Sequence, residues 1–215
     1  MFNHLSVASA FSFKYGTTQP HDLVARAAQF GAPALAITDR DSLAGVIRFV
    51  QAAKDFGIAP IVGVNLALDN SRVTLFAQSG TGTDSGWRSL CRLMSALRTD
   101  RNPPVLHLEK IKMLSEYTSN LILLHGPDSQ IANLITKHRP DQAIYEYNKY
   151  RPYFADSVIE CVSHLAPGDG PRSTGHAGRM LGFARDHDLP AVITNGVRML
   201  DAADGPIADI LDAAR

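Results

Sequence analysis

Pro33-Ala34-Leu35-Ala36-Ile37-Thr38 is the stretch that decides the fold class of this chain. Its apolar side chains point to both faces, which is typical of a parallel strand covered by helices on each side. Polar Asp39 follows directly, at the carboxyl end of the predicted strand. The stretch therefore predicts an α/β fold with a polar side chain at the strand end, where such folds bind their ligands.

A helical pattern precedes this strand. Thr18 can cap a helix that has Pro20 in its first turn, and Gly31 offers an easy end. The apolar residues of this helix recur on one face: Leu23, Val24, Ala27 and Phe30.

A second helical pattern follows the strand. Asp41 or Ser42 can cap this helix, which ends at Gly57. Its predicted apolar stripe is Leu43, Val46, Ile47, Val50 and Ala53. With strand patterns at 4–7 and 58–68, the order gives two β-α-β units and hence a parallel sheet, either open or closed into a barrel.

The rest of the chain keeps alternating between strand and helix. Strands are predicted at 121–124, 158–162 and 191–194, helices at 87–97, 130–137, 142–149 and 177–186, and connectors at 80–86, 102–104 and 166–171. Because no long linker or repeat divides the chain, we expect one domain over residues 1–215. The helix-forming run 210–215 has no Gly or Pro to stop it, so we expect that the domain is cut from a longer chain.

Composition narrows the class of protein. Of the 215 residues, 45% are hydrophobic and 20% are charged, which predicts a folded core and excludes collagen-like, disulfide-framed and disordered chains. Lys plus Arg and Asp plus Glu both total 21, so attraction to phosphate backbones is weak and an independent DNA-binding module is disfavoured. Two isolated cysteines and the lack of a signal peptide or membrane-spanning run predict a cytoplasmic location.

Motifs of self-contained catalysis are missing from the sequence. The eight histidines are dispersed, with no H-x-H or H-E-x-x-H arrangement for metal ions. There is no G-x-S-x-G elbow for a nucleophile. Residues 80–86 lack the Lys-Ser/Thr ending of a phosphate-binding loop. The sequence therefore supports no catalytic residue from its motifs alone.

Four segments together resemble the polymerase and histidinol phosphatase (PHP) domain at the N-terminus of bacterial family C DNA polymerases, which include replicative alpha subunits and error-prone relatives. They are HLSVASAFS at 4–12, LAITDRDSLAG at 35–45, PIVGVNL at 60–66 and AVITNGVR at 191–198. The resemblance covers essentially the whole chain. It implies a distorted (β/α)7-type PHP barrel with parallel strands covered by helices.

The resemblance also marks a damaged metal site. Where the family has metal-binding histidines, this sequence has Ser6 and Ala8, and other family ligand positions hold Arg40, Asn65, Gly196 and Arg198. Arg72 stands where many relatives carry another histidine. Four residues still match the family: His4, Asp39, Glu160 and His164. We therefore predict no bound metal and no catalytic residue.

The arginines oppose metal binding as well as failing to support it. A guanidinium stays charged in proteins, and at about 4 Å with an effective dielectric near 20 it repels a dication by roughly 8 kcal/mol. One hypothesis is that Arg40, Arg72 and Arg198 replace the charge of the metals and pair with Asp39, Asp41 or Glu160; the alternative is that they point to solvent. A second hypothesis is an anion site formed by the same arginines with His4 or His164.

The resulting prediction is a catalytically inactive structural PHP domain of a DNA polymerase III alpha-type subunit. It implies that the domain is a scaffold for the polymerase core of the same parent chain and a possible docking platform for other replisome or repair subunits. The segment itself would need no cofactor, since Mg²⁺ belongs to the polymerase core, and would meet DNA only through the parent protein. The alternative is a metal-dependent phosphoesterase, a 3′–5′ exonuclease or pyrophosphatase, that uses His4, Asp39, Glu160 and His164.

Overall fold

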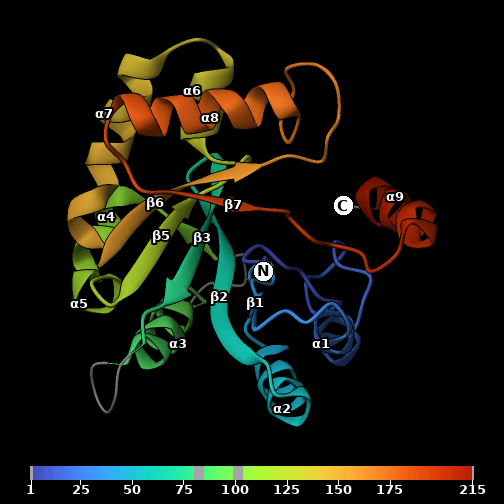
Figure 1. Ribbon diagram of the computed structural model, residues 1–215. Helices are drawn as coiled ribbons and strands as arrows, with labels where there is room; N and C mark the ends of the chain where they lie inside the picture. Colours follow the sequence, from blue (N-terminus) through green and yellow to red (C-terminus); the bar gives the residue numbers. More distant parts are fainter. Residues whose placement is uncertain (1, 80–84, 99–103, 215) are drawn as a thin grey trace. The chain divides into compact units, whose positions relative to one another are not determined.

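The computed structural model describes residues 2–79, 85–98 and 104–214 (Figure 1). The chain divides into two compact units. Unit 1 comprises Met1–Asn65 and Asn195–Arg215, and unit 2 comprises Leu66–Thr194. Most of the predicted connector 80–86 and residues 102–103 of the predicted break lie outside the described residues.

Unit 1 confirms the β-α-β order predicted around Ala34. Helix α1 (Pro20–Gln29) leads into strand β1 (Ala34–Ile37), and helix α2 (Val46–Phe56) leads into strand β2 (Ala59–Leu68), which enters unit 2 after Asn65. Strands β1 and β2 are parallel, with Ala34 opposite Ala59 and Ile37 opposite Val62. Unit 1 also holds the short helix η3 (Ala202–Asp204) and helix α9 (Gly205–Ala213). The helices pack an apolar core against β1 that includes Val24, Ile37 and Phe49.

The predicted strand at 4–7 is wrong as a full strand. This segment is extended, and its assigned pairing is a single parallel bridge between Val7 and Val197. Backbone hydrogen bonds still attach it to β1, because Ala36 N donates to His4 O (3.0 Å) and Thr38 N donates to Val7 O (2.8 Å). The alternating pattern therefore correctly predicted an extended segment. Its backbone pairing with neighbouring segments is too short to form a strand.

Two predicted helix caps in unit 1 are also wrong. Gln19, not Thr18, precedes α1, and it makes no side-chain capping bond. Gly45, not Asp41 or Ser42, precedes α2. Asp41 has a positive φ of 55°, so the chain turns once more before the helix begins. The cause is tertiary, because Asp41 N donates to Asn65 O at 2.9 Å and so continues the pairing with β2 instead of starting a helix.

The apolar stripe predicted for helix α2 is confirmed in part. Val46 and Ala53 are buried in the core as predicted, whereas Ile47 is 70% exposed and Val50 is 37% exposed. Phe49, which the predicted stripe left out, is buried as well, so the buried face is rotated from the predicted one. The predicted helix end is confirmed, since Gly57 takes the left-handed conformation at φ 69°.

Unit 2 contains the remaining strands and the larger set of helices. Its elements are β3 (Ser71–Ala77), α3 (Gly86–Leu97), β4 (Val105–Leu106), α4 (Leu108–Met113), α5 (Ser115–Thr118), β5 (Leu121–His125), α6 (Gln130–Thr136), α7 (Pro140–Tyr150), η2 (Arg151–Tyr153), β6 (Asp156–Val162), α8 (Thr174–Asp186) and β7 (Ala191–Thr194). Each strand and helix predicted between 87 and 194 is therefore found, with boundaries shifted by a few residues. Strand β3, strand β4 and helices α4 and α5 were not predicted.

The strands of unit 2 run in the order β2, β3, β5, β6, β7, with β4 beside β2. The pairs β2–β4, β5–β6 and β6–β7 are parallel. The pair β3–β5 is antiparallel, with Thr74 opposite Leu124. The structure thus confirms the predicted mixed α/β class with parallel strands and helices, and it adds the antiparallel pairing of β3 with β5, which the sequence did not show.

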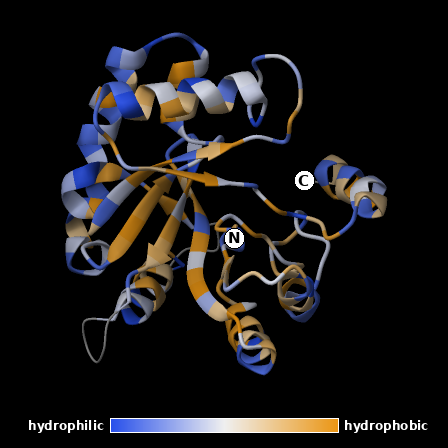
Figure 2. Cartoon of the chain, viewed as in Figure 1, coloured by the Kyte–Doolittle hydropathy of each residue, from blue (hydrophilic) through white to orange (hydrophobic). Residues whose placement is uncertain are grey.

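The strands of unit 2 are its most hydrophobic part (Figure 2). Helices α6, α7 and α8 form a core with β6 that includes Ile131, Tyr147, Ile159 and Met180. No helix among residues 2–79, 85–98 and 104–214 is long and apolar enough to cross a membrane.

Candidate functional site

Asp39 is the buried carboxylate of unit 1, directly beyond the end of β1. Its side chain is held by three donors: Ser9 N at 2.6 Å and Ser12 Oγ at 2.8 Å to Oδ1, and Ser9 Oγ at 2.9 Å to Oδ2. Burial raises the pKa of Asp39, while the hydrogen bonds from Ser12 and Ser9 act in the opposite direction. A Cβ atom at Gly45 would lie 2.7 Å from Oδ2, so the start of α2 closes over the carboxylate. Both oxygens are therefore engaged by the protein.

Two arginines of unit 1 meet at one tyrosine. The guanidinium carbon of Arg40 lies 3.4 Å from the ring centroid of Tyr15, and that of Arg198 lies 4.5 Å from it. Both distances are within the range of a cation–π interaction. Arg40 and Arg198 occupy two family ligand positions, so this cluster brings positive charge to the end of the unit 1 strands where the family resemblance implies metals.

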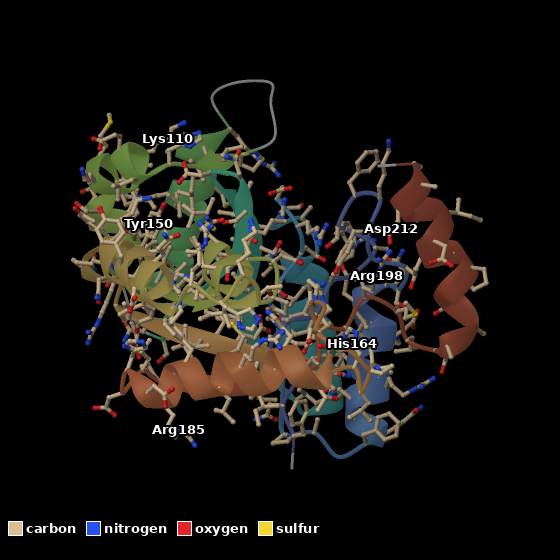
Figure 3. All side chains as sticks on the ribbon, turned by 90° about the horizontal axis from the view of Figure 1, so that it is seen from above. Lys110, Tyr150, His164, Arg185, Arg198 and Asp212 are labelled. Carbon is tan, nitrogen blue, oxygen red and sulfur yellow. The ribbon has the colours of Figure 1, made fainter. Side chains whose placement is uncertain are left out.

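Arg198 is also bonded to helix α9. Its Nη1 lies 2.7 Å from Asp212 Oδ2, and its Nη2 donates to Ala208 O at 3.0 Å (Figure 3). The hypothesis that Arg198 pairs with Asp39, Asp41 or Glu160 is therefore corrected: its ion pair is with Asp212. The arginine reaches the last helix because the segment that carries it leads directly into η3 and α9.

The other family positions in unit 1 contribute mainly their backbone. Val197 N donates to Ser6 O at 2.7 Å, and Ala8 N donates to Val197 O at 2.9 Å. Asn65 N donates to Asp39 O at 3.0 Å. Gly196 has a φ of 62°, a conformation that favours glycine. These bonds join the segments that carry Ser6, Asp39 and Arg198 into one framework.

His4 lies away from these donors. Burial lowers its pKa, and Nδ1 is a buried atom without a hydrogen-bond partner in the described part of the chain. With Arg26 and Asn195 it lines a mostly apolar pocket of about 220 Å³ beside α1. Burial of this unpaired nitrogen is unfavourable, and the nitrogen is not held by a hydrogen bond as the oxygens of Asp39 are.

The remaining predicted site residues belong to unit 2. Glu160 on β6 is buried and accepts a 2.5 Å hydrogen bond from Thr194 Oγ1 on β7. A Cβ atom at Gly126 would lie 2.2 Å from Glu160 Oε2, so a larger residue there would displace the carboxylate. Like Asp39, Glu160 is thus packed tightly against the protein.

Arg72 and His164 are linked to the same ion pair of unit 2. Arg72 N donates to Asp128 O at 3.0 Å, and His164 N donates to Arg172 O at 2.8 Å. The side chains of Asp128 and Arg172 pair at 2.6 Å. The structure therefore brings the chain around Arg72 and His164 together through Asp128 and Arg172, neither of which was a predicted site residue.

A metal ion fits poorly with the unit 1 positions. Ser6, Ala8, Arg40 and Arg198 offer no strong ligand, and the carboxylate of Asp39 already accepts three hydrogen bonds. Within the described part of the chain, no group of three or more His, Cys, Asp or Glu side chains is placed to hold a metal ion.

Comparisons with known proteins identify the family. The model of the PHP domain family matches residues 4–164. The chain belongs to the PHP domain family. An error-prone DNA polymerase of Symbiobacterium thermophilum is 32% identical and is aligned to 100% of this chain but to 21% of its own length. The DNA polymerase III subunit alpha of Buchnera aphidicola is 33% identical over 97% of this chain and 18% of its own length. The chain thus spans about a fifth of the length of these curated relatives.

Solved structures of PHP-like proteins share the fold. A proposed metal-dependent phosphoesterase of Bifidobacterium adolescentis has a TM-score of 0.58 and 14% identity, covering 91% of this chain and 87% of that one. An amidohydrolase of Chromobacterium violaceum, solved with bound sulfate and no metal, has the same TM-score and identity and covers 98% and 96% of the two chains. At this identity the comparison establishes a common fold for the PHP domain.

The sequence did not indicate which residues bind Asp39 and Arg198. Ser9 and Ser12 lie inside the first matching segment, so their hydroxyls could have been proposed as donors to Asp39. Tyr15 and Asp212 gave no such signal, because nothing in their local sequence indicates that both lie beside Arg198. Their roles depend on chain segments that meet only in the folded unit.

Proposed function

We propose that residues 1–215 are the PHP domain of a DNA polymerase III alpha-type protein, replicative or error-prone, and that this domain is structural and not hydrolytic. The observation that carries the proposal is the bonding of Asp39. Its buried carboxylate is bound on both oxygens by Ser9 and Ser12. Three of the roughly four acceptor sites of the carboxylate are thus occupied, so a metal ion would compete with these hydrogen bonds for the lone pairs of Asp39.

Charge supports the same proposal. Arg40 and Arg198 both lie within 4.5 Å of the Tyr15 ring centroid. Two fixed positive charges beside the former ligand positions repel divalent ions, as the Coulomb argument above requires. They also stabilise the framework through contacts with the aromatic ring.

The length of the relatives suggests what the domain supports. Four-fifths of each curated polymerase lies outside the region that this chain matches. We propose that the polymerase core of the same parent chain is the main partner, that Mg²⁺ acts in that core, and that DNA is reached only through it. Other replisome or repair subunits are further partners, and the parent protein is cytoplasmic.

An assay of phosphodiester hydrolysis tests the proposal. The purified protein is incubated with Mn²⁺ or Zn²⁺ and a single-stranded oligonucleotide or pyrophosphate, with Asp39→Ala as the matched variant. We expect no turnover above the rate of the variant. Turnover that a chelator and Asp39→Ala both abolish would instead establish the phosphoesterase alternative that uses His4, Asp39, Glu160 and His164.

The anion site at Arg40, Arg72 and Arg198 stays a prediction. In unit 1, Arg198 already donates from both terminal nitrogens to α9, and the test is therefore made at Arg40. A rise in melting temperature with phosphate that Arg40→Met removes would confirm the site. An unchanged melting temperature over the same titration would exclude it.

A further inference from the structure

Helix α9 exposes its apolar side chains. Ile207 and Ile210 are 51% and 68% exposed, whereas the buried residue of the helix is the small Ala208. Ile207, Ile210 and Leu211 stand at positions i, i+3 and i+4, so they share one face of the helix. We call these three residues the α9 stripe.

Several polar contacts hold α9 on unit 1. Arg198 bonds to Asp212 and to Ala208 O, and Lys14 Nζ donates to Ala214 O at 2.5 Å. Upstream of the helix, Arg26 binds both carboxylate oxygens of Asp201, at 3.0 and 3.1 Å. The helix is therefore attached along the side that carries Ala208 and Asp212. Of the α9 stripe, Ile207 and Ile210 are exposed and Leu211 is half-buried.

The exposed isoleucine side chains of α9 would stabilise a complex if a partner buried them. Burial of an exposed isoleucine is among the most favourable contributions to packing, and contiguous exposed apolar residues mark interaction surfaces. The polar contacts fix the direction of the stripe before any partner binds. Preorganisation of this kind strengthens binding, since the helix need not be ordered in the complex.

We propose that the α9 stripe is the face on which an apolar segment from the polymerase part of the same parent chain docks; this rests on the proposed function, because it names the partner of the scaffold. The relatives supply the reason for this occupant, since about four-fifths of their length lies outside the matched region. A tethered segment also binds at high effective concentration, so a small patch is enough.

Hydrogen exchange on the full-length polymerase chain tests the proposal. Ile210→Asp places a charge in the stripe, and Ile47→Asp is the matched control, because Ile47 is 70% exposed on α2 of the same unit. We expect Ile210→Asp to speed amide exchange in residues 207–213 by about tenfold or more and the control to leave it unchanged. Unchanged exchange in α1 shows that unit 1 of the variant is folded.

Two results would overturn the proposal. The first is equal exchange of α9 in the wild type, Ile210→Asp and Ile47→Asp. The second is a dimer of the full-length chain, seen by sedimentation, that Ile210→Asp dissociates, since a second copy would then cover the stripe. The hydrolysis assay reports separately on the proposed function, so metal-dependent turnover together with a protected α9 would leave the docking proposal intact.

Discussion

At the scale of single residues, Asp39 shows how a ligand position can become part of the framework. The residue keeps the identity that resembles the family, but its oxygens face Ser9 and Ser12. The three hydrogen bonds satisfy both the buried carboxylate and its donors, so loss of the carboxylate would leave buried donors without an acceptor. Asp39 therefore contributes to stability. The effect of substituting it should be measured on the free energy of unfolding as well as on activity.

Asp39→Ala should lower the free energy of unfolding by about 3 kcal/mol, because it leaves the buried donors of Ser9 and Ser12 without an acceptor. Urea unfolding of the wild type and the variant measures the difference. The control is Asp209→Ala on exposed α9, which should change the value by less than about 0.5 kcal/mol. Equal or greater stability of Asp39→Ala would show that the carboxylate is strained, as expected of a functional ligand.

At the scale of elements, Arg198 makes two of the polar contacts that attach α9. Arg198 joins Tyr15, Asp212 and the backbone of Ala208, and its side chain is 19% exposed. Arg198, which stands at a family ligand position, thus binds helix α9. The short helix buries little apolar surface of its own, so its position should be sensitive to this anchor.

Arg198→Met should lower the free energy of unfolding by about 1–2 kcal/mol, through loss of a partly exposed ion pair and a cation–π contact. It should also speed amide exchange in residues 205–213 more than in α1. Arg185→Met is the control, since Arg185 and Asp186 form a surface pair at 3.5 Å with both side chains largely exposed. If the two variants behave alike, Arg198 does not anchor α9.

At the scale of the whole molecule, buried histidines make the stability of the fold depend on pH. His125 is fully buried beside Ser157 and Tyr147, and burial lowers its pKa to about 3. In the unfolded chain its pKa is near 6.5. Below about pH 6.5 the unfolded chain therefore binds a proton that the folded chain excludes, and stability falls until about pH 3.

This difference predicts a loss of stability of up to about 5 kcal/mol from His125 between pH 7 and pH 3. Urea unfolding at several pH values measures the loss, and His125→Gln should make the dependence shallower. His4 and His176, whose pKa values burial also lowers, should account for part of what remains. The exposed His21 provides the control His21→Gln, and an identical pH profile for both variants would contradict the role of His125.

The fold class could be read from short-range patterns. The two-faced apolar stretch at Pro33-Ala34-Leu35-Ala36-Ile37-Thr38 is β1, and the helices around it are α1 and α2. A strand that is buried on both faces can be recognised from the local sequence, because its consecutive residues are nearly all apolar. Strand β3 escaped prediction because its run is interrupted by polar residues, including the buried Thr74.

Residue identities, set beside the family resemblance, predicted an altered metal-ligand set, since Ser6, Ala8 and Arg40 cannot act as histidines do. Only the tertiary structure decided what the substituted residues contact: Ser9 and Ser12 bind Asp39, and Arg198 binds Tyr15 and Asp212. The physical reason is that side-chain chemistry is a property of each residue. Hydrogen bonds and ion pairs form between segments far apart in the chain, and folding alone brings those segments together.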